Sequence, residues 1–138
     1  MQVQPYLNFD GRTEEALEFY TKALNAKVTA LMRFNESPEP CDPNLMPPGT
    51  EKKVMHSTFT IGDSVLMASD CHCSGQPKFE GISLALTPKS VGEAEKIFAA
   101  LSDGGAVMQP LTKTFWTPAF GVLTDRFGIS WMISVTEG

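Results

Sequence analysis

The sequence predicts an α+β protein made of two βαβββ modules, and three observations lead to this prediction. Each half of the chain contains one amphipathic helical stretch between segments with strand-like alternation. The apolar helical positions of the two halves match at one spacing, as for Ala16 and Ala94 (94 − 16 = 78). A length of 138 residues leaves room for one ordinary domain. We therefore expect a single domain over residues 1–138, with two repeats at about 1–72 and 78–138.

The first repeat has the order strand, helix and three strands. Pro5 restricts the first strand to a sheet edge or to the start of its pairing. Thr13 precedes two glutamates, which predicts a hydroxyl cap for a helix that ends near Asn25. A proline-rich loop over residues 35–50 is either a cover or a surface excursion. The predicted strands cover residues 3–9, 27–34, 53–61 and 64–69.

The second repeat has the same order of elements. Ser90 and Glu93 have the spacing of a capping box, and Gly104 begins a glycine pair that predicts a left-handed helix stop. Asp125 is expected to stabilise the turn of the final hairpin. The predicted strands cover residues 80–87, 106–114, 119–125 and 129–135, and the predicted buried stripe of the helix is Val91, Ala94, Ile97, Phe98 and Leu101.

The composition excludes several classes of partner. A net charge of −5 and a pI near 4.9 disfavour nucleic acid and anionic membrane surfaces as partners. No apolar stretch approaches the roughly 18–20 residues of a membrane span, and residues 1–5 lack the pattern of a signal peptide. An odd number of cysteines, namely Cys41, Cys71 and Cys73, favours free thiols in a reducing compartment. We therefore expect a cytoplasmic protein.

The duplicated pattern predicts a cavity. A single βαβββ module leaves one face of its sheet open, so two modules are expected to bury these faces around a shared cleft. Each sheet would then curve around that cleft.

Several motifs resemble a known group of proteins. They are Pro5–Phe9 with Glu14–Tyr20, Val54–Ser57, Thr114–Trp116 and Phe120–Ile133. The chain resembles the vicinal oxygen chelate superfamily, which includes glyoxalase I, bleomycin resistance proteins and extradiol dioxygenases. Within it, the chain is similar to PhnB-like proteins, which carry the label 3-demethylubiquinone-9 3-methyltransferase-like. The resemblance covers nearly the whole chain and implies the glyoxalase/bleomycin-resistance fold and a homodimer.

The same resemblance implies where a divalent metal ion would bind. Enzymes of the superfamily hold it with His, Gln or Glu from the first and fourth strands of each module. Carried onto this chain, these positions fall near Gln4 to Tyr6, near Met67, near Gly81 and at Met132. Of these residues only Gln4 suits a hard cation, because a thioether is a weak ligand for such ions. We therefore expect a cleft without the usual metal site, and no cofactor.

The residues expected to line this cleft favour a small apolar or aromatic ligand. They are Phe34, His56, Met67, Trp116 and Met132. An alternative is a metal-dependent lyase or dioxygenase of the same fold, using Gln4, His56 and a carboxylate such as Glu80 or Asp125. A third hypothesis is a non-catalytic dimer that contacts another protein. Whether the protein is an enzyme stays open.

Individual residues also have structural interpretations. His56 is either a general base or ligand or a hydrogen-bonded structural histidine. Trp131 is expected in the core. For Trp116, packing in the core and contact with a ligand are equally open interpretations. Cys71-His72-Cys73 lacks the second ligand pair of a zinc site, so a surface turn with free thiols is expected. The glycine pair that begins at Gly104 caps a helix, and the chain lacks the glycine-rich turn that methyl donors usually need.

Overall fold

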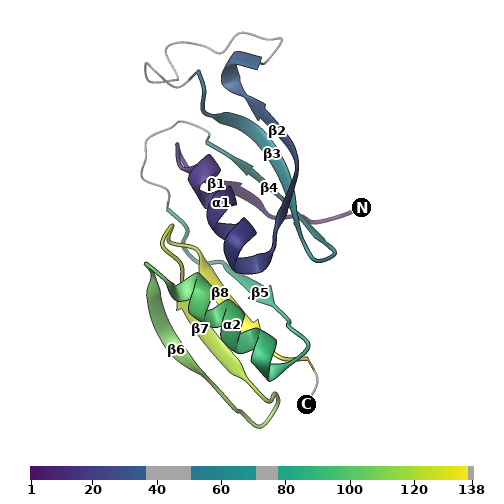
Figure 1. Ribbon diagram of the computed structural model, residues 1–138, viewed down its shortest axis with the longest axis vertical. Coiled ribbons are helices and arrows are strands. Elements are labelled where there is room, and N and C mark those ends of the chain that lie inside the picture. Colours follow the sequence, from purple (N-terminus) through teal and green to yellow (C-terminus); the bar gives the residue numbers. More distant parts are fainter. Residues whose placement is uncertain (37–50, 71–77, 137–138) are drawn as a thin grey trace. The chain divides into compact units, whose positions relative to one another are not determined.

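Two helices of equal length begin 78 residues apart (91 − 13 = 78) in the computed structural model. Helix α1 spans Thr13–Leu24 and helix α2 spans Val91–Ser102, with 12 residues each. The structure describes residues 1–36, 51–70 and 78–136. The chain divides into two units, Met1–Pro77 (unit 1) and Lys78–Gly138 (unit 2). Within these described ranges, each unit contains one α-helix and one four-stranded sheet (Figure 1).

Unit 1 contains the first sheet, in the order β1-β4-β3-β2. Strand β1 lies parallel to β4, and the other pairs are antiparallel. A short 3-10 helix, η1, follows β2. The bounds are β1 Tyr6–Asn8, β2 Lys27–Arg33, η1 Phe34–Glu36, β3 Val54–Ile61 and β4 Ser64–Ser69.

Unit 2 repeats this topology in the order β5-β8-β7-β6, again with one parallel pair, β5 with β8. The bounds are β5 Ser83–Leu86, β6 Ala106–Thr112, β7 Phe120–Thr124 and β8 Ser130–Ser134. The order of elements, strand, helix and three strands, is therefore the same in both units. This confirms the prediction of an α+β fold made of two βαβββ modules.

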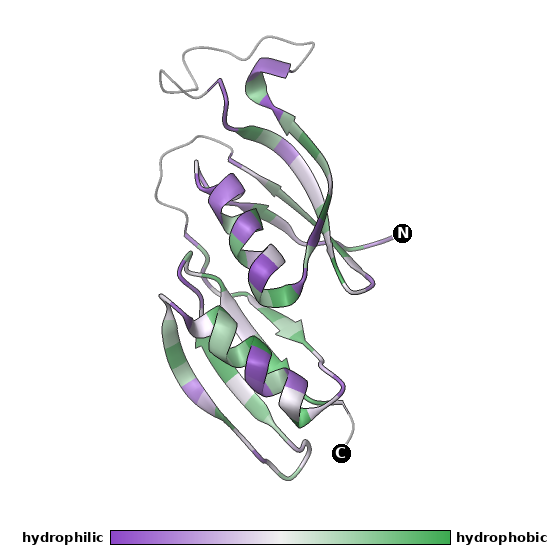
Figure 2. Cartoon of the chain, viewed as in Figure 1, coloured by the Kyte–Doolittle hydropathy of each residue, from purple (hydrophilic) through white to green (hydrophobic). Residues whose placement is uncertain are grey.

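The core of unit 1 lies between α1 and one face of its sheet. Tyr20 is fully buried, and its ring lies 6.2 Å from that of Phe9 and 6.3 Å from that of Phe59, between ring centroids. Figure 2 shows hydrophilic and hydrophobic residues alternating along both helices, as expected where one helix face is buried. Other buried members of this core are Leu7, Ala16, Leu17, Leu66 and Ala68.

The core of unit 2 depends on a close approach between α2 and β7. A Cβ atom at Gly121 would lie 2.6 Å from Cε2 of Phe98, so glycine is required for this packing. Ala94, Phe98 and Leu101 are buried on the helix, as predicted. Val91 was expected in the same stripe but is 39% exposed, because the helix buries its face only from Ala94 onward.

The two helices begin in different ways. Ser90 accepts a hydrogen bond from the backbone N–H of Glu93 at 3.1 Å, which confirms the predicted cap of α2. The predicted cap at Thr13 is wrong. Thr13 is the first residue of α1, and its buried hydroxyl has no hydrogen-bond partner among the described residues. The carboxylate of Asp70 instead accepts the backbone N–H of Thr13 at 2.8 Å.

Residues with special backbone conformations determine where the helices end and where two edge strands begin. Asn25, the residue after α1, lies in the left-handed region (φ 55°). Gly104 follows α2 in the same region (φ 80°), as predicted for the end of that helix. Strand β1 begins only after Pro5, and β5 begins at Ser83 rather than at residue 80, because Gly81 turns the chain at φ 76°.

Some predictions fall on residues that the structure does not describe. Cys41, Cys71, His72 and Cys73 lie outside the described residues, as does most of the proline-rich loop. Neither helix in the described ranges has the length and apolar character needed to cross a bilayer. The expectation of one cleft shared by the two modules stays a prediction.

Candidate functional site

The sheet of unit 1 has one face turned away from α1, called here the open face of unit 1. Residues on it alternate with residues buried beneath the helix, namely Leu7, Ser57 and Ala68. The strand register aligns Tyr6 with Met67, Met67 with Thr58, and Met32 with His56. These five side chains, which come from all four strands, therefore share the open face of unit 1.

His56 lies within hydrogen-bond distance of two neighbours on this face. The hydroxyl of Tyr6 lies 3.2 Å from Nδ1 of His56, and Oγ1 of Thr58 lies 3.5 Å from Nε2. The Tyr6 and His56 rings are 5.8 Å apart between centroids. His56 is thus hydrogen-bonded, as its structural interpretation requires, and is also partly exposed on the face that carries Met67. A neutral imidazole there can donate or accept one further hydrogen bond to a ligand.

The sheet of unit 2 has an equivalent face, the open face of unit 2. Met132 is aligned with Ala85 and Val122, whereas its neighbours Trp131 and Ile133 are buried beneath α2. Met132 therefore holds in unit 2 the position that Met67 holds in unit 1. The first-strand position opposite it is Ala85, not a residue near Gly81 as the sequence led us to expect, because β5 begins only at Ser83.

Trp116 belongs to an aromatic cluster beside this second face. Its ring meets that of Phe120 edge-on at 5.4 Å between centroids, and that of Phe115 at 4.8 Å. Phe120 shares the open face of unit 2 with Val122, because Gly121 between them faces α2. Trp116 is 57% exposed, so most of its ring is available to a ligand. Phe34 begins η1, directly after the end of β2, so it does not belong to a strand of the unit 1 sheet.

The donor set at these positions does not fit a divalent metal ion. The four equivalent strand positions hold Tyr6, Met67, Ala85 and Met132, which offer a phenol, two thioethers and a methyl group. Hard and borderline cations require several carboxylate, imidazole or amide donors. Within the described ranges, no three His, Cys, Asp or Glu side chains gather in a way that could hold a metal ion.

The residues of the alternative metal set make other contacts. Nε2 of Gln4 donates to the Gln2 side chain at 3.1 Å, and Glu80 forms an exposed ion pair with Lys78 at 3.4 Å. Gln4 and His56 belong to unit 1, whereas Glu80 belongs to unit 2. No step through a metal ion follows from these residues.

Asp125 is a structural carboxylate. Its Oδ1 accepts the backbone N–H groups of Phe127 and Ile129 at 2.9 and 3.1 Å, and its Oδ2 accepts the indole N–H of Trp131 at 2.8 Å. These bonds confirm its predicted role in the turn. Trp131 is 1% exposed, which confirms its predicted place in the core.

Two important residues were not identified from the sequence. Tyr6 was included only in a range of metal positions, although its alternation with the apolar Leu7 places it on the open face. Asp70 is 1% exposed and accepts hydrogen bonds from Gly11, Thr13 and Val54. No local signal marks Asp70, because its partners lie 16 to 59 residues away in sequence.

The connections from strand to helix do not fit a methyl-donor site of the glycine-rich kind. The segment between β1 and α1 contains Gly11 alone, and the segment between β5 and α2 contains no glycine. Such sites use several glycines at the end of a strand in a parallel sheet. Each sheet here has only one parallel pair. No methyl-transfer step follows from these residues.

Comparisons with known proteins find relatives that match this chain over nearly its whole length. The sequence model of the family described as 3-demethylubiquinone-9 3-methyltransferase matches residues 1–134. Protein YjdN of Escherichia coli (strain K12) is 32% identical over 99% of this chain and 97% of its own length.

Solved structures support the same relationship. Protein PA1353 from Pseudomonas aeruginosa is 39% identical, with 100% of this chain and 99% of that chain covered and a TM-score of 0.85. A PhnB protein from Bacillus cereus is 29% identical, covers 99% of this chain and 100% of its own, and has a TM-score of 0.79.

A more distant structure supports the fold alone. It is a glyoxylase/bleomycin resistance protein/dioxygenase domain from Frankia sp. EAN1pec, with 13% identity, 97% and 94% of the two chains covered, and a TM-score of 0.67. The chain therefore belongs to the PhnB-like family described as 3-demethylubiquinone-9 3-methyltransferase, which has the glyoxalase/bleomycin-resistance fold.

Proposed function

We propose that the protein binds a small apolar or aromatic molecule on the open faces of its sheets, without a divalent metal ion. The observation that carries this proposal is the pair of equivalent register positions, Tyr6 with Met67 and Ala85 with Met132. These positions offer sulfur, aromatic and methyl surfaces in place of metal donors. A homodimer and a cytoplasmic location, which the resemblance and the composition predict, belong to the same proposal.

The chemistry of the two methionines supports an apolar or aromatic ligand. A thioether is polarizable and flexible, and it makes favourable contacts with the edges of aromatic rings. Met67 and Met132 are both partly exposed, each at the same position of its own sheet. An apolar molecule laid against either side chain would remove that surface from water.

The hydrogen-bonded pair of Tyr6 and His56 supplies a polar handle beside Met67. Binding sites for small molecules are lined mainly by apolar groups, and a few polar groups fix the orientation of the ligand. The imidazole has two nitrogens, of which Nδ1 contacts Tyr6 and Nε2 has only a long 3.5 Å contact to Thr58. A ligand hydroxyl or carbonyl group can therefore bind at Nε2.

The experiment uses the full chain with its methionine methyl groups labelled with ¹³C. A panel of monocyclic aromatic alcohols and amides is titrated while the methyl resonances are recorded by NMR. We expect saturable shifts of the Met67 or Met132 methyl resonance. Met108, which is 65% exposed on strand β6, should not shift and serves as an internal control.

Variants then locate the ligand. Met67→Ala and Met132→Ala should weaken binding by about tenfold, because each removes several buried methylene equivalents from the contact. Met108→Ala is the matched control and should bind as the parent does. Stoichiometric binding of Mn²⁺ or Zn²⁺ that shifts the Met67 and Met132 methyl resonances would overturn the metal-free proposal. Equal loss in the Met108→Ala variant would overturn the placement of the ligand.

A further inference from the structure

A pocket of about 470 Å³ lies on the helix side of unit 1, away from the open face. It is lined by Glu14 of α1, Arg33 at the end of β2, Asn35 of η1, and Lys52 and Lys53 before β3. Arg33 is aligned with Val54, which is buried on the helix side of the sheet, whereas His56 lies on the opposite face. This pocket is therefore distinct from the proposed ligand site.

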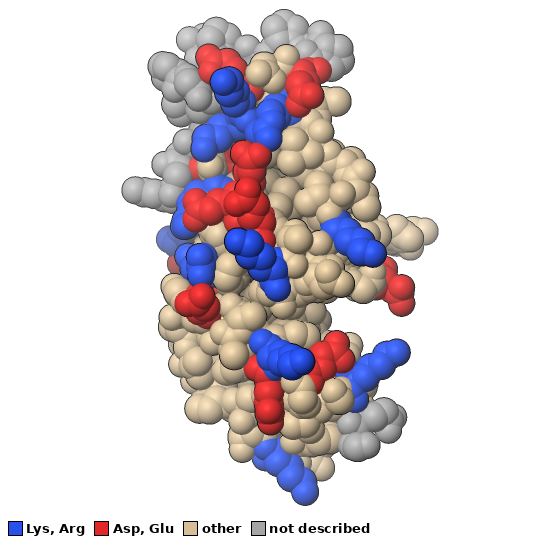
Figure 3. Space-filling model, in the orientation of Figure 1, with Lys and Arg blue, Asp and Glu red and all other residues tan. Residues whose placement is uncertain are grey.

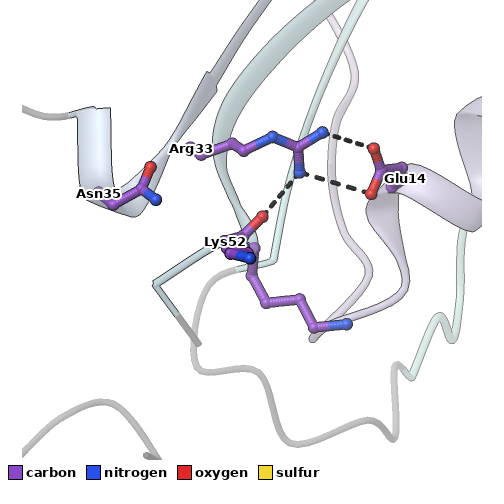
Figure 4. A pocket seen from close by; sticks show the side chains of 5 residues that line it. Glu14, Arg33, Asn35 and Lys52 are labelled. Carbon is purple, nitrogen blue, oxygen red and sulfur yellow. Dashed lines mark hydrogen bonds and ion pairs between the residues drawn. The ribbon is translucent and has the colours of Figure 1, made fainter. Parts of the chain in front are cut away.

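The guanidinium of Arg33 donates hydrogen bonds to three oxygen atoms of two residues. It donates to the two carboxylate oxygens of Glu14 at 2.5 and 3.4 Å, and to the carbonyl oxygen of Lys52 at 2.7 Å. Figure 4 shows the guanidinium between the Glu14 carboxylate and the Lys52 carbonyl group, and Asn35 lies on the side of Arg33 away from Glu14. The hydrogen bond from Arg33 is the main cause that lowers the pKa of Glu14 below its ordinary value, so Glu14 is ionised at neutral pH.

The residues that line the pocket carry a net positive charge, whereas the whole protein carries a net negative charge. Three cationic side chains meet a single carboxylate, whereas the chain carries a net charge of −5. On the face of unit 1 that carries α1, basic and acidic side chains lie next to one another (Figure 3). Glu14 forms its ion pair with Arg33, and the charge of Lys53 also acts on Glu14. Neither lysine forms an ion pair with a carboxylate among the described residues.

The ammonium groups of Lys52 and Lys53 have N–H donors that are available to a ligand. Nζ of Lys53 donates one hydrogen bond to the carbonyl oxygen of Gly11 at 2.9 Å, and an ammonium group has three donors. For the Lys52 ammonium, the described part of the chain supplies no ion pair or hydrogen bond. Because a carbonyl carries no formal charge, neither ammonium is neutralised by these contacts.

We propose that this pocket binds a small oxyanion, a carboxylate or phosphate group carried by a small molecule. Lysine ammonium groups bind such anions through charge-assisted hydrogen bonds, and the Asn35 amide adds a neutral donor. The volume lies in the range of small-molecule pockets, roughly 300–1,000 Å³. Because the pocket and the open face are on opposite sides of the sheet, either site can be occupied without the other.

The test is a titration of the ¹⁵N-labelled full chain with inorganic phosphate and, in a second arm, with citrate. Ionic strength is kept low and constant with sodium chloride, because salt screens exposed charges. We expect saturable shifts of the backbone amides of Asn35, Lys52 and Lys53. The arm with the lower dissociation constant identifies whether a phosphate or a carboxylate group is preferred.

Lys52→Glu is the decisive variant, since its replacement breaks no ion pair or hydrogen bond of the Lys52 ammonium group with the described residues. It should weaken anion binding by about tenfold or more, because a charge-assisted contact becomes a repulsive one. Lys96→Glu on helix α2 of unit 2 makes the same charge change elsewhere and should bind as the parent does. Unaltered amide shifts outside unit 1 check the fold.

Two outcomes would overturn the proposal. One is equal affinity in Lys52→Glu and the parent protein. The other is a linear response without saturation in both arms, which would indicate an adventitious ion only. The methionine methyl resonances report the open faces separately, so failure of this site leaves the proposed function intact.

Discussion

The carboxylate of Asp70 accepts the backbone N–H of Thr13 at 2.8 Å, so the start of α1 is capped by a residue 57 positions later in the chain. The same Oδ1 accepts the N–H of Gly11 at 2.9 Å, and Oδ2 accepts the N–H of Val54 at 2.7 Å. Asp70 thereby connects the loop before α1 to the start of β3. The arrangement satisfies three backbone donors with one buried charge.

Replacement of Asp70 should destabilise the protein strongly. Asp70→Ala removes the acceptor of three backbone N–H groups, and the bonds from Thr13 and Val54 are buried. We expect a loss of roughly 3–5 kcal/mol in the free energy of unfolding. Asp70→Asn should cost less, because its one carbonyl oxygen can still accept from Gly11 and Thr13. Urea unfolding measures both. Asp63→Asn in an exposed turn is the control, and a comparable loss there would contradict the argument.

The bond between Trp131 and Asp125 leads to a second prediction. Trp131→Phe preserves most of the aromatic volume but removes the N–H that donates to Oδ2 of Asp125. Because that oxygen is buried, we expect a loss of about 1–3 kcal/mol, measured by urea unfolding. Trp116→Phe, at an exposed site, should change stability little. Similar losses in the two variants would mean that the indole hydrogen bond contributes nothing specific.

Much of the fold could be predicted from the sequence because each module repeats the same local signals. The apolar positions of the two helices recur at one offset, and Ser90 and Asn25 carry the expected signals of a helix start and a helix end. Thr13 shows the limit of this reasoning. Its sequence context resembles a cap, but Asp70 lies close to it only after β4 has paired with β1.

The candidate site was predictable only in part. Strand alternation and the family resemblance place His56, Met67 and Met132 on strands, and the register then aligns the methionines at equivalent positions. The hydrogen bond between Tyr6 and His56 spans 50 residues and depends on the order of strands in the sheet. The cationic pocket has no motif, because its residues come from a helix, a strand end, η1 and a loop.

The ion pair of Glu14 and Arg33 leads to a pH-dependent prediction. The folded pKa of Glu14 lies below its ordinary value of 4.5, with the Arg33 hydrogen bond as the main cause. A depressed folded pKa contributes stability above the unfolded pKa and loses it as the pH falls through the folded pKa. Glu14→Gln should therefore be slightly less stable than the parent at neutral pH, and the difference should vanish in acid.

The measurement for Glu14 combines unfolding and titration. Urea unfolding of the parent and Glu14→Gln gives the stability difference at each pH. NMR titration of the Glu14 carboxyl group in Arg33→Gln should give a higher pKa than in the parent protein. The contribution to stability is expected to be small, because the pair is largely exposed to solvent and is screened by salt. An unchanged pKa in Arg33→Gln would remove Arg33 as the cause.

Replacement of Trp116 can distinguish a role in ligand binding from a role in core packing. The ring is 57% exposed, and its contacts are with Phe115, which is 97% exposed, and with Phe120. Trp116→Ala should therefore lower the melting temperature by only a few degrees, whereas it should weaken uptake of an aromatic ligand by about tenfold or more. Differential scanning calorimetry and the methionine-methyl titration measure the two effects. A large fall in melting temperature with unchanged ligand affinity would assign Trp116 to packing. A ring that packs against the sheet but does not contact the ligand would affect stability and leave the affinity unchanged.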